Sequence, residues 1–358
     1  MPEDIKQILE SLFEEVLRVD ATDIHLSANR HPILRICSKL TILTDRPILT
    51  GEQMKSIADM LMETPEQKNR FATQKDCDLS LAYKDKARFR INIYQQFARI
   101  SIAMRYIPSK VRTLEELSLP PILHQFTKPS QGFVLVVGPS GHGKSTVLAA
   151  MVDEINHLRA DHIITIEDPI EYTFVPDKCI IDQREIGIDT PDFHRGLRSM
   201  FRQDADVVMV GEMRDQETIS TVVTAAETGH LIFSTLHTNT AAQTIDRIID
   251  SFPPYQQSQI RSQLASTLLG IISRRLVPTL QGGIINAVEV LIVNSAVRNL
   301  IREGKVHQID MVINTSIDEG MVSLNRSLAD LIKQGIVSLE SAELFSISPA
   351  ELRLLLQN

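Results

Sequence analysis

The feature that most constrains this chain is a glycine-rich segment between an apolar run and a helical run. Residues 133–137 are apolar, and residues 138–146 read GPSGHGKST. The segment matches the pattern GxxxxGK[ST] in its required context, directly after a predicted strand and before a predicted helix over 144–158. Its glycines let successive backbone N–H groups turn inward as an anion-binding nest, and the helix N-terminus adds a partial positive charge. The segment therefore predicts a nucleotide triphosphate site, and its context makes a chance glycine-rich turn the weaker interpretation.

The backbone and the side chains of this segment have different expected roles. The nest is made of backbone groups, whatever side chains the loop carries. Lys144 would reach the β- and γ-phosphates, and the Ser145 hydroxyl would be a ligand of Mg²⁺. The predicted nucleotide-binding residues are Gly138, Pro139, Ser140, Gly141, His142, Gly143, Lys144, Ser145 and Thr146.

The pattern after residue 131 predicts an α/β domain. Short runs rich in Val and Ile alternate with helical segments, which is typical of βαβ units and of a parallel sheet buried on both faces. The runs are 133–137, 163–166, 207–210 and 231–233, and the helices between them are 144–158, 192–202 and 216–228. Beyond about 255 we expect mainly helices, over 256–276, 296–302, 323–333 and 338–355.

The N-terminal third has a different texture. An amphipathic helix over 5–17 precedes segments at 23–26, 33–36 and 88–94 that alternate polar and apolar residues, the period of half-buried strands. Residues 51–71 have a helical pattern. We therefore expect an α+β domain over 1–106, a linker over 107–130 that begins in a proline-containing stretch, and a second domain over 131–358.

Composition narrows the classes of function. The chain has 37 Lys+Arg against 45 Asp+Glu, a net charge of −8, and 5% aromatic residues with no Trp. Nucleic-acid binding is disfavoured, because it needs a basic surface and stacking rings. Three cysteines without a CxxC pair fit a reducing cytoplasm and exclude a four-thiolate zinc site. We expect a cytoplasmic protein without a membrane span, since no apolar run reaches roughly 18 residues and the first ten residues lack a signal-peptide core.

Two acidic segments follow predicted strands, where α/β sheets place their ligands. TIEDPIEY, over 165–172, brings Glu167 and Glu171, carboxylates that are costly to hold together unless a cation or substrate offsets them. Their alternative role is to cap the next segment and face water. VVMVGE ends in Glu212, which is the expected position for an acid beside the metal and the attacking water.

A fourth segment ends another predicted strand. Ser234 and Thr235 carry hydroxyls that could sense the γ-phosphate, and His237 follows them. His230 lies seven residues earlier, but the segment offers no third ligand at a spacing suited to a metal. The sequence leaves a structural and a functional role for His237 equally open.

In this order, the four segments resemble the motifs of the secretion-ATPase superfamily of type II secretion, type IV pilus and type IV secretion machines. GPSGHGKST is similar to its Walker A motif, TIEDPIEY to its Asp box, VVMVGEMRD to its Walker B motif, and TGHLIFSTLHTNTAAQTIDRIID to its His box. AVRNLIREGK resembles the C-terminal signature of the retraction, or twitching-motility, ATPases of this superfamily. ATDIHLSANRHPILR, ARFRINIY and MRYIPSKVRTLEEL resemble their N-terminal domain.

The resemblance implies a homohexameric ring of subunits with a PAS-like N-terminal domain and a RecA-like P-loop NTPase domain, whose helical C-terminal part covers about 256–358. ATP would bind between the two domains, with Mg²⁺ held by Ser145 and, indirectly, Glu212. His142 departs from the family, which usually has Ser at this position of the loop.

The resemblance also implies the catalytic roles. An acid, which is Glu212, Glu167 or Glu171, would orient water, and His237 would report loss of the γ-phosphate. Two arginines of the N-terminal domain that lie fifteen residues apart would reach the phosphates. Arg90 and Arg105 have this spacing, and Arg88 is the alternative. Positive charge of this kind is what the loose transition state of phosphoryl transfer requires.

The function that follows is Mg-ATP hydrolysis that powers type IV pilus retraction from the base of the machine at the inner membrane, where the ring would turn a PilC-like platform protein. The sequence leaves open whether a second retraction ATPase works beside this protein. It also leaves open whether this protein is itself an accessory PilU-like motor. Assembly and type II secretion ATPases carry a further N-terminal domain and usually a tetracysteine zinc module, for which this chain has neither the length nor the cysteines. A nucleic-acid translocase and a ring subunit without turnover are the alternatives from other classes.

Overall fold

The computed structural model describes residues 2–36, 39–84, 86–108 and 110–357. The chain divides into two compact units, Met1–Lys110 and Val111–Asn358. No helix in the described ranges is both long enough and apolar enough to cross a bilayer.

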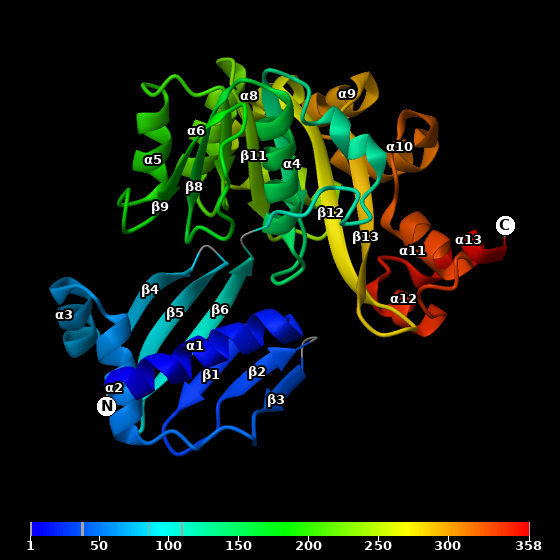
Figure 1. The fold of residues 1–358 in the computed structure, drawn as a ribbon. Coiled ribbons are helices and arrows are strands. Elements are labelled where there is room, and N and C mark those ends of the chain that lie inside the picture. The colour runs from blue at the N-terminus through cyan, green and yellow to red at the C-terminus, as the bar shows by residue number, and fades with distance from the viewer. Residues whose placement is uncertain (1, 37–38, 85, 109, 358) are drawn as a thin grey trace. The chain divides into compact units, whose positions relative to one another are not determined.

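Unit 1 is a six-stranded antiparallel sheet with three helices. The strand order is β3-β2-β1-β6-β5-β4. The strands are β1 Asp23–Ser27, β2 Ile33–Ile36, β3 Lys39–Ile42, β4 Asp76–Tyr83, β5 Ala87–Gln96 and β6 Arg99–Pro108. The helices are α1 Pro2–Val19, α2 Gly51–Leu61 and α3 Pro65–Gln74. Helix α1 lies across one face of the sheet (Figure 1) and buries Phe13, whose ring stacks on Phe89 of β5 with centroids 4.3 Å apart.

The helix predicted over 51–71 is two helices. Thr64 begins α3 with a capping box, in which its hydroxyl accepts a hydrogen bond from the Gln67 N–H and the Gln67 side chain accepts one from the Thr64 N–H. Pro65 occupies the first helical position. Both features stabilise the start of a new helix after Thr64, so the preceding helix α2 ends before this residue.

Unit 2 is built on a seven-stranded sheet of order β13-β12-β7-β11-β10-β8-β9. Neighbouring strands are parallel except β12 and β13, which form a long antiparallel hairpin (Figure 1, yellow). The strands are β7 Gly132–Val137, β8 His162–Glu167, β9 Ile180–Glu185, β10 Val207–Val210, β11 Leu231–Leu236, β12 Leu268–Pro278 and β13 Ile284–Ile292.

Helices connect and cover these strands. They are α4 Lys144–Leu158, α5 Phe193–Met200, α6 Gln216–Glu227, α7 Ala241–Asp250, α8 Pro254–Thr267, α9 Ser295–Glu303, α10 Ile309–Thr315, α11 Leu324–Lys333, α12 Leu339–Phe345 and α13 Pro349–Gln357. Three short 3₁₀ segments are η1 Pro121–Gln125, η2 Val306–Gln308 and η3 Ile317–Glu319.

The core of unit 2 lies on both faces of the sheet. Successive β7 side chains alternate between two apolar clusters, with Leu135 in one and Val134 and Val136 in the other, beside Val147 of α4. Every residue of β7, β10 and β11 is buried. The expectation of a parallel sheet buried on both faces is therefore confirmed, with an antiparallel strand added at one edge.

The prediction of helix over 256–276 is wrong in its second half. Helix α8 ends at Thr267, and β12 begins at Leu268. A Cβ on Gly270 would lie 2.3 Å from Cε1 of Phe126, so this strand position requires glycine. Residues 271–277 mix apolar side chains with Ser273, Arg274 and Arg275 and are mostly buried on both faces of the strand. They therefore have no period that distinguishes strand from helix. Five further strands were not predicted, namely β3, β4, β6, β9 and β13. The single helix predicted over 338–355 is two helices, α12 and α13, separated at Ser346–Ser348.

Most of the predicted linker lies within unit 2. Leu114, Leu117, Leu119, Leu123 and Phe126 are buried in the apolar cluster that includes β7 and α4 side chains. These residues therefore belong to the hydrophobic core of the second unit.

Candidate functional site

The glycine-rich loop joins the C-terminal end of β7 to the N-terminus of α4. Gly143 is the residue before the helix and has a left-handed backbone, with φ of 72°. The N–H groups of Ser140, Gly141 and Gly143 donate to no backbone or side-chain acceptor within the described residues. The first turn of α4 adds the free N–H groups that every helix start leaves. This set of donors fits a bound phosphate chain.

Two of the loop glycines lie directly against Arg274 of β12. A Cβ on Gly138, where φ is 145°, would lie 2.5 Å from the Arg274 carbonyl oxygen. A Cβ on Gly143 would lie 2.4 Å from Nη1 of Arg274, which donates a hydrogen bond to the Gly143 carbonyl. Thus β12, which the sequence analysis did not recognise as a strand, forms one wall of the loop.

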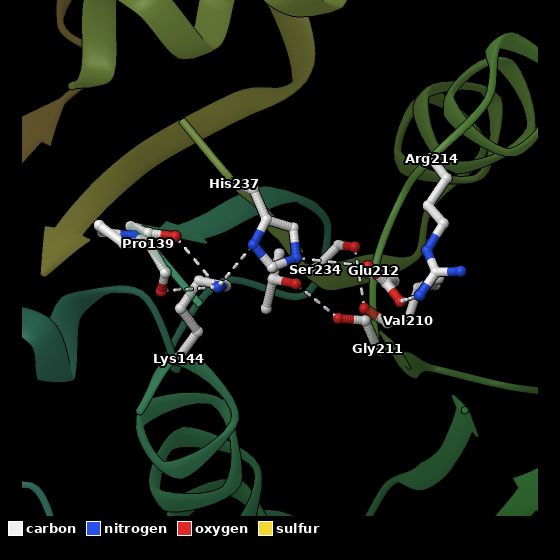
Figure 2. A network of polar contacts seen from close by, with 10 residues as sticks. Pro139, Lys144, Val210, Gly211, Glu212, Arg214, Ser234 and His237 are labelled. Atoms are coloured by element: carbon white, nitrogen blue, oxygen red, sulfur yellow. Dashed lines mark hydrogen bonds and ion pairs between the residues drawn. The ribbon is translucent and has the colours of Figure 1, made fainter. Parts of the chain in front are cut away.

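Lys144 lies inside the loop. Its Nζ donates to the carbonyls of Gly138 and Pro139, at 3.0 and 3.2 Å, and lies 3.3 Å from Nδ1 of His237 (Figure 2). Burial lowers the pKa of Lys144, and the nearby carboxylates of Glu212 and Glu171 oppose this shift. A bound phosphate would therefore replace these groups as hydrogen-bonding partners of the Lys144 amine.

Glu212 follows β10 and lies beside the histidine. Its Oε2 is 3.4 Å from Nε2 of His237, and Oε1 accepts a hydrogen bond from Arg214 (Figure 2). Burial would raise the pKa of Glu212, but the hydrogen bonds from Arg214 and His237 hold it below its usual value. Glu212 is therefore held as a carboxylate, close to the lysine. Arg214 lies within the predicted Walker B segment VVMVGEMRD, but nothing in that segment's sequence indicates its contact with Glu212.

The two acids of the Asp box have different surroundings. Glu167 is 4% exposed, and its oxygens accept hydrogen bonds from the Thr165 hydroxyl at 2.7 Å and the Glu171 N–H at 3.3 Å. Burial, the largest cause, raises the pKa of Glu167 to about 7. Glu171 is exposed. Both remain candidates for orienting water, but Glu167 is already engaged by protein donors.

Three hydroxyl groups of the predicted site are engaged within the protein. The Ser234 hydroxyl donates to the Val210 carbonyl at 2.8 Å, and that of Thr235 donates to the Gly211 carbonyl at 2.6 Å. These hydrogen bonds join β11 to the end of β10. The role of the two hydroxyls toward a γ-phosphate stays a prediction. The Thr146 hydroxyl is 2.8 Å from that of Tyr172. This pair ties α4 to the Asp-box segment.

The two histidines of the His box lie at opposite ends of β11. His237 follows the strand, whereas His230 precedes it and has its Nδ1 3.0 Å from the Ala225 carbonyl oxygen. Only His237 reaches the site. Within the described residues no cluster of three His, Cys, Asp or Glu side chains could hold a metal ion. The predicted Mg²⁺ ligands, Ser145 and Glu212, would share the ion with the nucleotide, a mode that needs few protein ligands.

The buried arginines of β12 are site residues that the sequence analysis missed. Arg274 is 3% exposed, and burial lowers its pKa to about 10. Arg275 donates to the Asn239 carbonyl and side-chain oxygens, both at 3.0 Å. The sequence signal that could have identified them is a pair of adjacent arginines within a largely apolar run. An arginine side chain is rarely buried without a partner, so this pattern indicates a specific contact.

In unit 1, Arg90 of β5 and Arg105 of β6 are directly opposite each other across the ladder. Arg105 donates to Asp23 at 3.0 Å, whereas Arg90 is exposed and has no charged or hydrogen-bonding side-chain partner within the described residues. Arg88 donates to the Ser80 hydroxyl at 3.1 Å. Asp23 offsets the charge of Arg105, so Arg90 is the arginine of this pair whose side-chain donors stay available to an anion.

Comparisons with known proteins identify the family of this chain. The family model described as type II/IV secretion system protein matches residues 2–284. The chain is 42% identical to the type IV pilus retraction ATPase PilT of Pseudomonas aeruginosa over 90% of this chain and 93% of that protein. It is 35% identical to the type IV pilus ATPase PilU of the same organism, over 96% and 91%.

A solved structure of the pilus retraction motor PilT with bound ADP has a TM-score of 0.89, with 42% identity over 96% of this chain and 98% of that one. The loop, the acids and the histidine thus occur in a fold shared along almost the whole length of a nucleotide-bound relative. The chain therefore belongs to the type II/IV secretion system protein family, as an ATPase of its PilT-like branch.

Proposed function

We propose that this chain is a homohexameric motor that hydrolyses Mg-ATP to power retraction of a type IV pilus. One observation carries the proposal. Lys144, His237 and Glu212 form a continuous polar chain at the carboxyl edge of a parallel sheet, in a protein 42% identical to PilT over nine tenths of its length. The hexamer, the metal and the partners are inferred from the family.

The side chains would share the work of hydrolysis. The loop N–H groups and Lys144 would hold the phosphates, and Ser145 and Glu212 would hold Mg²⁺, which when bound offsets phosphate charge. Glu212 would orient the attacking water, because it is the acid already held ionised beside the lysine. Arg90 and Arg105 would neutralise the charge that develops on the phosphoryl group.

The mechanical step needs partners. A ring whose subunits change shape as they hydrolyse ATP would turn a PilC-like platform protein, so that pilin subunits return to the inner membrane. The protein would then work peripherally at the cytoplasmic side of that membrane.

The decisive experiment is a deletion strain complemented with the wild-type gene, with Lys144→Ala, or with Lys178→Ala as a matched control. Lys178 is an exposed lysine of the same unit. We expect excess surface pili without surface motility, corrected by the wild-type and Lys178→Ala genes and not by Lys144→Ala. A strain without pili would assign the protein to assembly. Normal pili and motility would contradict a primary retraction role and leave the accessory one.

A further inference from the structure

The side chain of His142, although it belongs to the nucleotide loop, is engaged by two elements outside the loop. Its Nδ1 accepts a hydrogen bond from the Leu276 N–H of β12 at 2.9 Å. Its ring meets the ring of Phe345, the last residue of α12, edge-on, with centroids 6.3 Å apart and planes at 64°. The loop is thus joined through one side chain to the C-terminal helices.

The hydrogen bond to Leu276 replaces a missing strand contact. Pairing between β7 and β12 ends at Ser273 and Val137, because β7 stops there and the loop begins. Beyond this point β12 has no strand on the side where β7 lay. The Leu276 N–H donates to the imidazole nitrogen of His142 instead. A backbone donor at a half-buried position is costly to leave without an acceptor.

The same part of β12 supports α12. Val277, next to Leu276, is fully buried in the apolar cluster that contains Ala342 of α12, and Phe345 packs against this cluster. Helix α12 also contacts β12 directly. His142, Leu276, the cluster and Phe345 therefore form a closed set of contacts between the loop and the C-terminal helices.

We propose that His142 is a positioning residue that fastens the nucleotide loop to β12 and α12, so that the packing of the C-terminal helices sets nucleotide affinity. This inference rests on the nucleotide site of the proposed function and adds a control point to it. Because coupling between two sites is reciprocal, bound nucleotide would in turn stabilise α12.

The neutral ring is the form that can accept this hydrogen bond, with its proton on Nε2. Burial lowers the pKa of His142, as do the neighbouring Arg275 and Arg274 of β12 and Lys144 of α4. The surroundings therefore favour the form that the contact needs.

The test measures ADP binding to the purified full-length protein by titration with a fluorescent ADP analogue. His142→Leu keeps a branched side chain that can pack but removes the acceptor. His142→Asn keeps an acceptor atom bonded to Cγ, as in the native ring. Phe345→Ala removes the ring of α12. Phe201→Ala is the matched control, because Phe201 also meets a histidine, His230, edge-on at 5.5 Å, away from the loop.

We expect His142→Leu to weaken ADP binding about tenfold, as expected for a lost hydrogen bond to a half-buried donor. His142→Asn should stay within about threefold of wild type, Phe345→Ala should weaken binding about threefold, and Phe201→Ala should have no effect. With ATP as substrate, the KM of His142→Leu should rise by a larger factor than its kcat falls.

Equal affinity of His142→Leu and wild type would overturn the proposal, as would equal weakness of the Asn and Leu variants. An unaffected Phe345→Ala protein would overturn the link to α12. If the Leu variant does not fold, hydrogen exchange of the wild-type protein decides instead, because added ADP must slow exchange in residues 339–345. Failure of wild type itself to bind ADP would refute the nucleotide site, a result distinct from failure of the coupling.

Discussion

The Nζ atom of Lys144 lies 3.3 Å from Nδ1 of His237. An ammonium group can only donate, so Nδ1 accepts, and the proton of the neutral ring is on Nε2. That nitrogen points toward Glu212, whose Oε2 is 3.4 Å away. His237 therefore connects the residue that would hold the phosphates with the carboxylate that would orient water.

Replacement of His237 by Ala should lower the rate of hydrolysis more than the affinity for nucleotide. We expect kcat to fall by roughly 10²-fold, because Glu212 loses the group that positions it, while ADP affinity stays within about threefold. Phosphate release and ADP titration measure the two quantities. His230→Ala, at the other end of β11, is the control and should retain activity. A parallel loss of affinity and kcat in His237→Ala would show that the ring mainly shapes the binding site.

Removal of Arg214 should move the pH dependence of hydrolysis. Arg214 helps to keep the pKa of Glu212 below its usual value, so Arg214→Ala should raise that pKa. If the ionised form of Glu212 is required, the acidic limb of the kcat/KM profile shifts to higher pH. The control is Arg353→Ala, which breaks a similar pair with Glu343 at 2.6 Å elsewhere in unit 2. An unchanged acidic limb would mean that protonation of Glu212 does not control the pH dependence of hydrolysis.

Replacement of Arg90 should have opposite effects on activity and on stability. We expect Arg90→Ala to lower kcat at least about 10²-fold, as for a lost arginine finger. The same change relieves the repulsion between Arg90 and Arg105 and should slightly raise the thermal midpoint. Arg99→Ala, at an exposed position at the start of β6, is the control. A normal rate in Arg90→Ala would remove it from the catalytic set.

Glu289 provides a stability test that is independent of catalysis. This residue of β13 is 3% exposed and accepts a hydrogen bond from the Ala241 N–H at 2.7 Å, and burial raises its pKa to about 7. Since the folded state binds this proton more tightly than the unfolded state, the stability that it contributes is lost as pH rises from about 4.5 through 7.

Glu289→Gln cannot ionise and keeps an acceptor oxygen. It should match wild type at pH 4.5 and exceed its free energy of unfolding by about 3 kcal/mol at pH 8. Urea denaturation at the two pH values measures this difference, and Glu63→Gln, at an exposed position in unit 1, is the control. A variant less stable than wild type at pH 8 would mean that Arg275 stabilises the ionised form more than burial opposes it.

The part of the fold closest to the nucleotide loop could be predicted from sequence, because its signals are local. The motif from Gly138 to Thr146 fixes a strand before it and a helix after it, and Val207–Val210 is a strand with the predicted bounds. Lys144, Glu212 and His237 were assigned to one site because parallel strands deliver their carboxyl ends to the same edge.

The rest depends on contacts between distant segments. Nothing local shows that Leu268–Pro278 pairs with β7, or that Arg274 reaches the Gly143 carbonyl across 131 positions of sequence. The hydroxyls of Ser234 and Thr235 have acceptors only because β10 is their neighbour. Polar β9 was missed because an edge strand needs no continuous apolar run.

The contacts of the two loop glycines with β12 limit how relatives of this chain can diverge. A side chain at 138 would meet a carbonyl oxygen, which every amino acid at 274 supplies, so no second substitution can accommodate the change. A side chain at 143 would meet only the flexible end of Arg274, which a shorter residue would remove, leaving the cost of the left-handed backbone. In an alignment, position 138 should therefore be glycine whatever residue stands at 274. Position 143 should be glycine because of its left-handed backbone and not because of its neighbour.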